Sequence, residues 1–284
     1  MSLAISAHAK INIGLKITGQ REDGYHTIET IFQEISLADE IILEKTSKGT
    51  QLICSEPLLS SKNENLCLKA LKTMRQAFAF REDVSIQLKK NIPIGAGLGG
   101  GSTDAAAVLV GLTKLFNLKI HPERLKECAL SIGADVPFFL KGGCQVATGI
   151  GEELTTAVLP KIGAILLVFP QKEISTAWAY KNFKLKNDLS HEHVTSNFLT
   201  LIDAQASWDE LGMLFENDFE SLVFQTYPEI GDLKRRLIEA GAQYASLSGS
   251  GSTVFGIFED AFMAKRAMQQ FSSFQTFIAF PIPS

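Results

Sequence analysis

The chain has 284 residues, of which 45% are hydrophobic and 20% charged, and its formal net charge is −4. This composition is typical of a globular protein with one large domain or two ordinary ones, and it argues against nucleic acid or an anionic membrane as partner. Residues 1–10 lack the pattern of a secretory signal, and no apolar run is long enough for a membrane span, so we expect a cytoplasmic protein. The widely spaced cysteines, without a C-x-x-C pair, predict free thiols: Cys54, Cys67, Cys128 and Cys144.

The first predicted element is a strand, because apolar residues occupy every odd position from Ile5 to Ile17. It is long for one strand, so we expect a bulge or break at Gly14. The further elements follow in chain order: a strand over 27–46, a helix over 64–80, a strand over 84–93, helices over 104–116 and 121–132, a short turn or helix and then a strand pair within 133–154, a strand over 161–170, a polar loop over 181–196, helices within 198–240, two strands around a glycine loop at 249–252, a helix over 260–271 and a last strand over 274–284. Strands and helices are intermixed without a steady alternation, which favours an α+β architecture. We place two domains at residues 1–155 and 156–284.

The stretch PIGAGLGGGSTDAAAVL, residues 93–109, holds five glycines in seven positions directly before a helix-forming run. Glycine allows a backbone to approach a ligand closely, and the free N–H groups of a helix start suit an anion. Ser102 and Thr103 are suitable N-cap residues, and Asp104 would then complement the dipole in the first helical turn. The stretch therefore predicts a phosphate-binding loop.

Other glycine-rich motifs fit this stretch less well. GAGLGG matches the dinucleotide fingerprint, but no acidic residue follows at the end of a second strand about 20 positions later. A Walker A motif would need lysine where Gly101 stands. A flexible glycine turn without a ligand is the remaining alternative.

The pattern P-x-x-x-G-L-G-G-G-S-T-D-A-A resembles the central motif of the GHMP kinases, which include galactokinase, homoserine kinase and mevalonate kinase. Three more motifs resemble those of one branch of that superfamily: A-K-I-N, D-G-Y-H and S-L-S-G-S-G-S-T. This branch acts on CDP-methylerythritol in the non-mevalonate isoprenoid pathway. The resemblance covers nearly the whole chain, least clearly residues 181–240. It implies a two-domain GHMP kinase fold with mixed β-sheets, packed helices and an active site in the cleft between domains. The implied reaction is phosphorylation of the substrate's 2-hydroxyl.

The resemblance also implies the catalytic residues, Lys10 and Asp135. Without it, Lys10 would be read as a solvated lysine on the polar face of a strand, and Asp135 as a helix N-cap ahead of Pro137. The expected donor is ATP with Mg²⁺, and Ser102 is expected near the phosphates and the magnesium, although no metal ligand can be assigned. The implied ATP-binding residues are Asn65 and Leu66 at the adenine, and Pro93, Gly95, Ala96, Gly97, Leu98, Gly99, Gly100, Gly101, Ser102 and Thr103.

Two loop-borne residues, Tyr25 and His26, are expected to read the cytidine, since a base can stack on an aromatic ring and bond a polar edge. The alternative is an ordinary turn aromatic beside a solvated histidine. Tyr180 is expected to close the other side of the base, with Trp178 the less favoured candidate. The implied substrate-binding set also contains Asn12, Thr176, Gly249 and Gly251. Another GHMP kinase and a non-catalytic ligand sensor remain alternatives, and the protein is expected to be a monomer or a homodimer.

Overall fold

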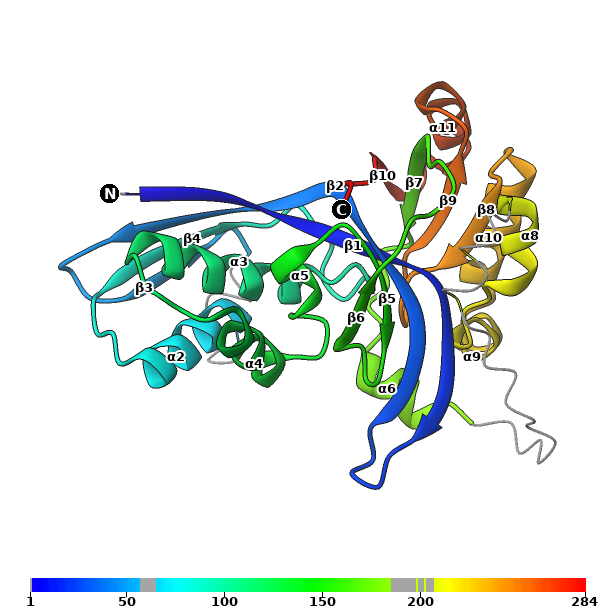
Figure 1. Cartoon of the computed structure of the whole chain (residues 1–284). Coiled ribbons are helices and arrows are strands. Elements are labelled where there is room, and N and C mark those ends of the chain that lie inside the picture. Colours follow the sequence, from blue (N-terminus) through cyan, green and yellow to red (C-terminus); the bar gives the residue numbers. More distant parts are fainter. Residues whose placement is uncertain (1, 57–64, 185–197, 199–201, 203–206) are drawn as a thin grey trace. The chain divides into compact units, whose positions relative to one another are not determined.

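The computed structural model describes residues 2–56, 65–184, 198, 202 and 207–284 (Figure 1). The chain forms two compact units, each built from interleaved segments. The first consists of Met1–Ala9, Leu37–Ile94 and Gly99–Gly142, and the second of Lys10–Ser36, Gly95–Leu98 and Gly143–Ser284. The boundary expected between residues 155 and 156 stays a prediction.

The first unit packs helices on a small sheet. In this unit the second half of β2 (His26–Lys45) pairs antiparallel with β4 (Val84–Lys89), and β3 (Gln51–Cys54) pairs parallel with β4. Figure 1 shows the longer helices along one side of these strands. Apolar residues of strands and helices, Ile41, Ile86, Met74, Val108 and Leu112 among them, form its core. The helices of this unit are α2 (Leu66–Phe78), α3 (Gly100–Leu115), α4 (Pro122–Ile132) and α5 (Phe138–Lys141).

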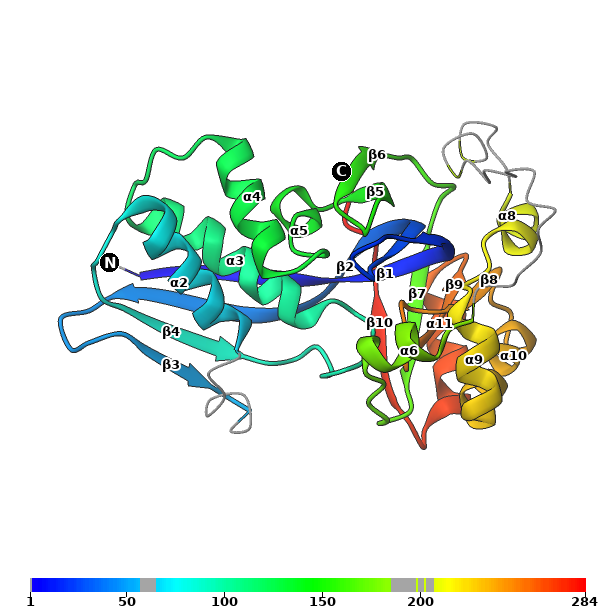
Figure 2. The same ribbon diagram turned by 90° about the horizontal axis from the view of Figure 1, so that it is seen from below.

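The second unit contains the first half of β2, paired with β1 (Ser2–Gln20) and antiparallel to β5 (Cys144–Thr148), which pairs with β6 (Glu153–Thr156). A four-stranded antiparallel sheet has the order β10-β7-β9-β8. Its strands are β7 (Ala164–Phe169), β8 (Tyr244–Leu247), β9 (Val254–Phe258) and β10 (Gln275–Ala279). The helical elements are α6 (Thr176–Asn182), α8 (Trp208–Leu214), α9 (Phe219–Thr226), α10 (Pro228–Glu239), α11 (Ala261–Met268) and the 3₁₀ turn η1 (Gln269–Phe271). Helices α9 and α10 lie side by side (Figure 2).

Strand β1 confirms the predicted alternation only in part. Its central residues, from Ala9 to Leu15, are buried on both faces, so the polar face that the sequence shows is not a solvated one. Gly14 has φ +67°, which is irregular for a strand, but β1 runs from Ser2 to Gln20 without the break that was one of the two expectations. A Cβ at this position would lie 3.0 Å from the Cβ of Phe215, so only glycine fits there without a shift.

The remaining predicted elements are confirmed with adjusted ends, and the α+β fold class with them. The helical region predicted within 198–240 contains three separate helices in its described part. The predicted polar loop at 181–196 begins instead with the end of α6, and its residues 185–196 lie outside the described residues. All four cysteines are free, as predicted. Within the described ranges, no helix has the length and apolar character needed to cross a membrane.

Candidate active site

The centre of the candidate site in the second unit is a buried lysine on β1. Lys10 Nζ donates to Asn12 Oδ1 at 2.5 Å and lies 4.9 Å from the ring centre of Phe32. Asn12 Nδ2 donates to Thr30 Oγ1 at 3.0 Å, and that hydroxyl donates to the carbonyl of Gly14 at 2.6 Å. This chain of hydrogen bonds orients the ammonium group. Because an ammonium buried in this way is stable only among polar partners, a solvated surface lysine does not describe Lys10.

The first half of the glycine-rich loop lies against the second glycine loop, as two hydrogen bonds show. Ser248 Oγ donates to the carbonyl of Gly97 at 3.0 Å, and the backbone N–H of Thr253 donates to the carbonyl of Ala96 at 3.2 Å. Gly97 has φ +77°, and a Cβ there would lie 2.1 Å from the carbonyl oxygen of Ser248 and 3.0 Å from that of Gly251. A side chain at residue 97 would therefore push the two loops apart.

The second glycine loop also approaches the lysine. A Cβ on Gly249 would lie 3.3 Å from Asn12 Oδ1 and 3.7 Å from Lys10 Nζ. Asn217, which the sequence analysis did not single out, fixes this loop: its Nδ2 donates to the carbonyls of Leu247 and Gly249, both at 2.8 Å. The structure therefore brings the predicted residues of β1 and of the second glycine loop together.

Two further residues of the predicted ATP set, Leu98 and Gly95, extend this arrangement. The backbone N–H of Lys10 donates to the carbonyl of Leu98 at 3.0 Å, which joins β1 to the glycine-rich loop. The N–H of Ile174 donates to the carbonyl of Gly95 at 3.4 Å. Pro93 is partly buried and belongs to the first unit, at the end of its segment Leu37–Ile94.

Helix α3 in the first unit begins earlier than predicted. Its cap is Gly99, with φ +72° and no side-chain cap hydrogen bond, and its first residue is Gly100. Ser102 and Thr103 are therefore helical residues and not caps, and Asp104 does not lie in the first turn, so these three predictions are wrong. Glycine replaces the expected hydroxyl cap because the chain enters the helix from a left-handed conformation, which glycine adopts at little cost.

The residues expected at the adenine lie beside this helix start. Asn65 is the N-cap of α2, its Oδ1 accepting from the N–H of Cys67 at 2.9 Å. A Cβ on Gly101 would lie 3.2 Å from Cδ1 of Leu66. The structure thus places Leu66 against the first turn of α3, with Asn65 next to it in sequence. Contact with adenine stays a prediction.

Asp135, also in the first unit, lies in the turn before α5, three residues ahead of Phe138. It is half-buried, and the cap position of α5 is Pro137. The alternative assignment of Asp135 as the N-cap of that helix is therefore wrong. Its catalytic role stays a prediction.

The D-G-Y-H motif forms the turn between β1 and β2, with Gly24 at φ +86°. Tyr25 is 61% exposed. The ring of His26 stacks on that of Tyr180 at 5.2 Å between centres, and Tyr180 packs edge-on against Phe219 at 4.9 Å. The turn and α6 thus share an aromatic cluster, which contains two of the four predicted base-reading candidates, His26 and Tyr180.

Helix α6 also carries a hydroxyl toward the second glycine loop. The helix begins at Thr176 after the N-cap Ser175, and Thr176 Oγ1 lies 3.2 Å from Ser250 Oγ. The ring centre of Trp178 lies 6.1 Å from that of Tyr227. Contact of Tyr180 or Trp178 with a base stays a prediction.

A buried ion cluster in the first unit is the feature that the sequence analysis missed. Lys90 Nζ donates to Asp104 Oδ2 at 2.7 Å and also contacts Asp39 Oδ2. Burial raises the pKa of Asp104 to about 7, an effect that Lys90 opposes and Asp39 reinforces. Asp104 Oδ1 is buried and has no hydrogen-bond partner in the part of the chain that the structure describes. Lys90 is 14 residues from Asp104 and 51 residues from Asp39 in the chain, so the cluster gives no local sequence signal.

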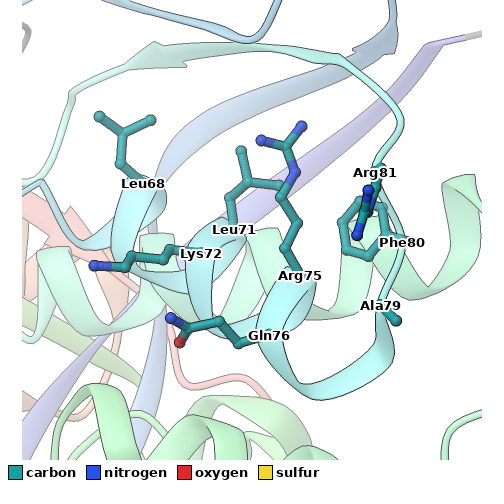
Figure 3. A pocket seen from close by; sticks show the side chains of 8 residues that line it. All are labelled: Leu68, Leu71, Lys72, Arg75, Gln76, Ala79, Phe80 and Arg81. Atoms are coloured by element: carbon teal, nitrogen blue, oxygen red, sulfur yellow. The ribbon is translucent and has the colours of Figure 1, made fainter.

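A separate cavity of about 480 Å³ lies along α2 in the first unit and involves none of the predicted site residues (Figure 3). Its wall combines apolar and basic side chains: Leu68, Leu71, Lys72, Arg75, Gln76, Ala79, Phe80 and Arg81. Among the residues of known placement, no group of three or more His, Cys, Asp or Glu residues could hold a metal ion.

Comparison with known proteins decides the family. The family models "GHMP kinases N terminal domain" and "GHMP kinases C terminal" match residues 65–143 and 200–275. A protein of Chloroherpeton thalassium named 4-diphosphocytidyl-2-C-methyl-D-erythritol kinase is 44% identical over 92% of this chain and 90% of its own length. The chain belongs to the GHMP kinases, in the family of 4-diphosphocytidyl-2-C-methyl-D-erythritol kinases.

Other similar proteins also match over most of the length of both chains. The protein of the same name from Acetivibrio thermocellus is 39% identical over 91% of both chains. A crystal structure of 4-(cytidine 5'-diphospho)-2C-methyl-D-erythritol kinase has a TM-score of 0.81 at 31% identity, covering 99% of this chain and all of that one. Homoserine kinase from Cytophaga hutchinsonii has a TM-score of 0.79 at 18% identity over 99% of this chain and 95% of its own, which shows a shared fold only.

Proposed function

We propose that this protein transfers the γ-phosphoryl group of ATP to the 2-hydroxyl of 4-diphosphocytidyl-2-C-methyl-D-erythritol, in the non-mevalonate route to isoprenoid precursors. The observation that carries the proposal is the near-full-length identity of 39–44% with relatives of that name. In the transfer, the hydroxyl oxygen bonds to the γ-phosphorus, the bond from that phosphorus to the β,γ-bridging oxygen breaks, and ADP leaves. The hydroxyl proton must be accepted, and the charge on the transferring group must be stabilised.

The start of α3 is the proposed phosphate site. The helix has 16 residues and a glycine cap that leaves its first N–H groups without a side-chain acceptor. Such groups, with the positive end of the helix dipole, favour phosphate oxygens. Leu66 and Asn65 are the proposed adenine contacts, because Leu66 lies against this turn.

Mg²⁺ is the proposed metal. It retains water ligands and binds largely through the phosphates of its nucleotide, so the lack of a cluster of acidic or histidine ligands among the described residues fits such a metal. It supplies charge neutralisation on the triphosphate when bound.

Lys10 and Asp135 are the proposed catalytic residues. The ammonium of Lys10, held by Asn12 and buried, supplies a fixed positive charge at low solvent exposure, where electrostatic stabilisation is strongest. Asp135 is assigned the hydroxyl of the substrate, whose proton it orients and finally accepts.

The aromatic cluster of the D-G-Y-H turn is the proposed cytidine site. The exposed ring of Tyr25 supplies a stacking surface, and His26 and Tyr180 supply a polar edge and a second ring. Thr176 and Ser250 offer hydroxyl groups, and the backbone at Gly249 and Gly251 allows close approach. We further propose a cytoplasmic location, which the free cysteines support, and a monomer or homodimer as the oligomeric state.

The proposal is tested with the purified chain, ATP, Mg²⁺ and four acceptors: CDP-methylerythritol, homoserine, mevalonate and galactose. The formation of ADP is followed by a coupled assay, and the product by ³¹P NMR. We expect a new phosphomonoester signal with CDP-methylerythritol and turnover of the other acceptors at least about 10³-fold lower, because buried polar groups of the site would stay unpaired with them. Turnover of another acceptor at an equal kcat/KM, or binding of CDP-methylerythritol without turnover, would contradict the proposal.

A further inference from the structure

Both flanks of the glycine-rich loop connect to one buried charge centre in the first unit. Lys90 lies three residues before Pro93, and Asp104 lies five residues after Gly99, the cap of α3. Lys90 joins Asp104 to Asp39 of β2, and each of the three side chains is at most 5% exposed. We propose that Asp39, Lys90 and Asp104 form a positioning cluster that holds the first turn of α3 in the geometry required by the phosphates of ATP. The inference rests on the ATP site of the proposed function.

Asp39 fixes the segment that leads into the loop. Its Oδ1 accepts the backbone N–H groups of Asn91 at 2.6 Å and of Ile92 at 2.8 Å, and Asn91 Nδ2 donates to the carbonyl of Ala38 at 2.8 Å. Strand β4 ends at Lys89, so these groups have no further ladder partners there. A carboxylate thus takes the place of a paired strand immediately before the loop.

Lys90 fixes the first turn of α3. A Cβ on Gly100 would lie 3.2 Å from Lys90 Nζ and 3.1 Å from Cγ2 of Ile92, so the ammonium lies against the backbone of the first helical residue. Lys90 also reaches Asp104, about one turn further along the same helix. A shift of Lys90 would therefore be transmitted to the N–H groups assigned to phosphate.

The cluster cannot lose a member without rearrangement. Its side chains are removed from water, and a buried charge requires a partner. Replacing Lys90 leaves two carboxylates facing each other, and they separate or take up a proton. Either response alters the two flanks of the loop that the cluster holds together.

The test compares Lys90→Met with Lys89→Met. Lys89 is the neighbouring residue, but its ammonium pairs with Glu40 at 2.9 Å in an exposed position, where such a pair contributes little. Affinity for ATP and, separately, for CDP-methylerythritol is measured by calorimetry, with thermal unfolding and steady-state kinetics on the same samples. We expect Lys90→Met to weaken the affinity for ATP at least about tenfold, since small misplacements of binding groups are costly. Its affinity for CDP-methylerythritol, and both affinities of Lys89→Met, should stay within about twofold of the native values, as expected for exposed or distant changes.

A second variant, Asp104→Asn, keeps a side-chain oxygen as a partner for Lys90, and it tests the inference if Lys90→Met does not fold. We expect this variant to weaken the affinity for ATP, and not that for CDP-methylerythritol, by about threefold or more, since a hydrogen bond to a charged group is lost or weakened. Equal losses of both ligands would show a cluster that serves stability alone and would overturn the inference, as would native ATP affinity in a folded variant. If the native protein binds no ATP, the proposed function fails. If the native protein binds ATP and the folded variants bind it equally well, only the inference about the cluster fails.

Discussion

Lys10 donates a 2.5 Å hydrogen bond from its ammonium to the side-chain oxygen of Asn12, two residues further along the same strand. Residues two apart on a strand project on the same face, so the pair is a direct product of β1. We expect Lys10→Met to lower kcat about 10²-fold or more, the usual loss for one electrostatic group of a catalytic site. Asn12→Ala should lower it about 10-fold to 150-fold, corresponding to a hydrogen bond to a charged group.

The double variant separates a joint role from two independent ones. If Asn12 acts through Lys10, Lys10→Met combined with Asn12→Ala should be no slower than Lys10→Met alone. Rate losses that multiply would show that Asn12 has a role of its own at the substrate. Single-turnover measurements at saturating ATP are suited to this comparison, because they report the transfer step.

Asp135→Asn should lower kcat by about 10²-fold or more with little change in ATP affinity, because the variant cannot accept the hydroxyl proton. The residue precedes α5, whose cap is Pro137, so the change removes no helix cap. The melting temperature is measured on the same samples to separate a loss of catalysis from a loss of stability. A rate close to that of the native enzyme would exclude Asp135 from the chemistry.

Gly97→Ala is expected to destabilise the protein and to abolish tight ATP binding. The added methyl group would lie 2.1 Å from the carbonyl oxygen of Ser248, at a φ of +77°. Gly24→Ala is the matched control, since Gly24 has φ +86° and nothing within 4 Å of a Cβ. Both variants are strained at φ, and only the first meets backbone. Calorimetric melting should show a fall for Gly97→Ala that exceeds that for Gly24→Ala by about 4 °C or more; equal falls would contradict the close approach of the two loops.

Tyr25→Ala should raise the KM for CDP-methylerythritol about 5-fold to 150-fold, the range for a base that loses an aromatic stacking partner. ATP affinity should change by less than about twofold, as expected for a site that the change does not touch. His26→Ala should instead reduce the preference for the cytidine over the uridine form of the substrate, because it removes a polar edge. The assay is kcat/KM for both forms. If both variants weaken the binding of ATP and neither weakens the binding of CDP-methylerythritol, the turn binds the phosphoryl donor and not the acceptor.

The pKa of Asp104 predicts a pH dependence of stability. In the unfolded chain this carboxyl ionises near 3.8, whereas burial raises its pKa in the folded chain to about 7. Between these values the folded state binds the additional proton, so the group's contribution to stability falls as pH rises from about 4 to about 7. The melting temperature of the native protein minus that of Asp104→Asn should therefore fall from pH 5 to pH 8, by about 2 °C or more. A difference that stays constant, or rises, would show that Asp104 is ionised throughout.

Local patterns were sufficient for most of the fold. The alternation from Ile5 to Ile17 predicted β1, and the single glycine at residue 14 predicted its irregularity, because both depend on neighbours in sequence. The start of α3 was predicted wrongly at Ser102 and Thr103, because the capping preference for hydroxyl side chains ignores a glycine that enters the helix from positive φ.

The candidate site residues were proposed from motifs, whereas the residues that hold them in place were not. Lys10 and Gly249 were each recognised, but nothing local indicates that Asn217 holds the second glycine loop or that Lys90 lies between two carboxylates. These contacts join residues far apart in the chain. Each of these polar or charged residues, taken alone, is of a type usually found on the solvated surface. Tertiary contacts of this kind follow from the fold and not from a pattern of neighbouring residues.

The hydrogen bond from Ser248 to the carbonyl of Gly97 joins residues 151 positions apart. Domains generally form as the chain leaves the ribosome, amino-terminal parts first. The glycine-rich loop of a nascent chain, however, lacks this contact until residues 244–258, the two strands that carry the second glycine loop, have been synthesised. Translation must therefore be nearly complete before the first half of the glycine-rich loop has the contacts that fix its final conformation.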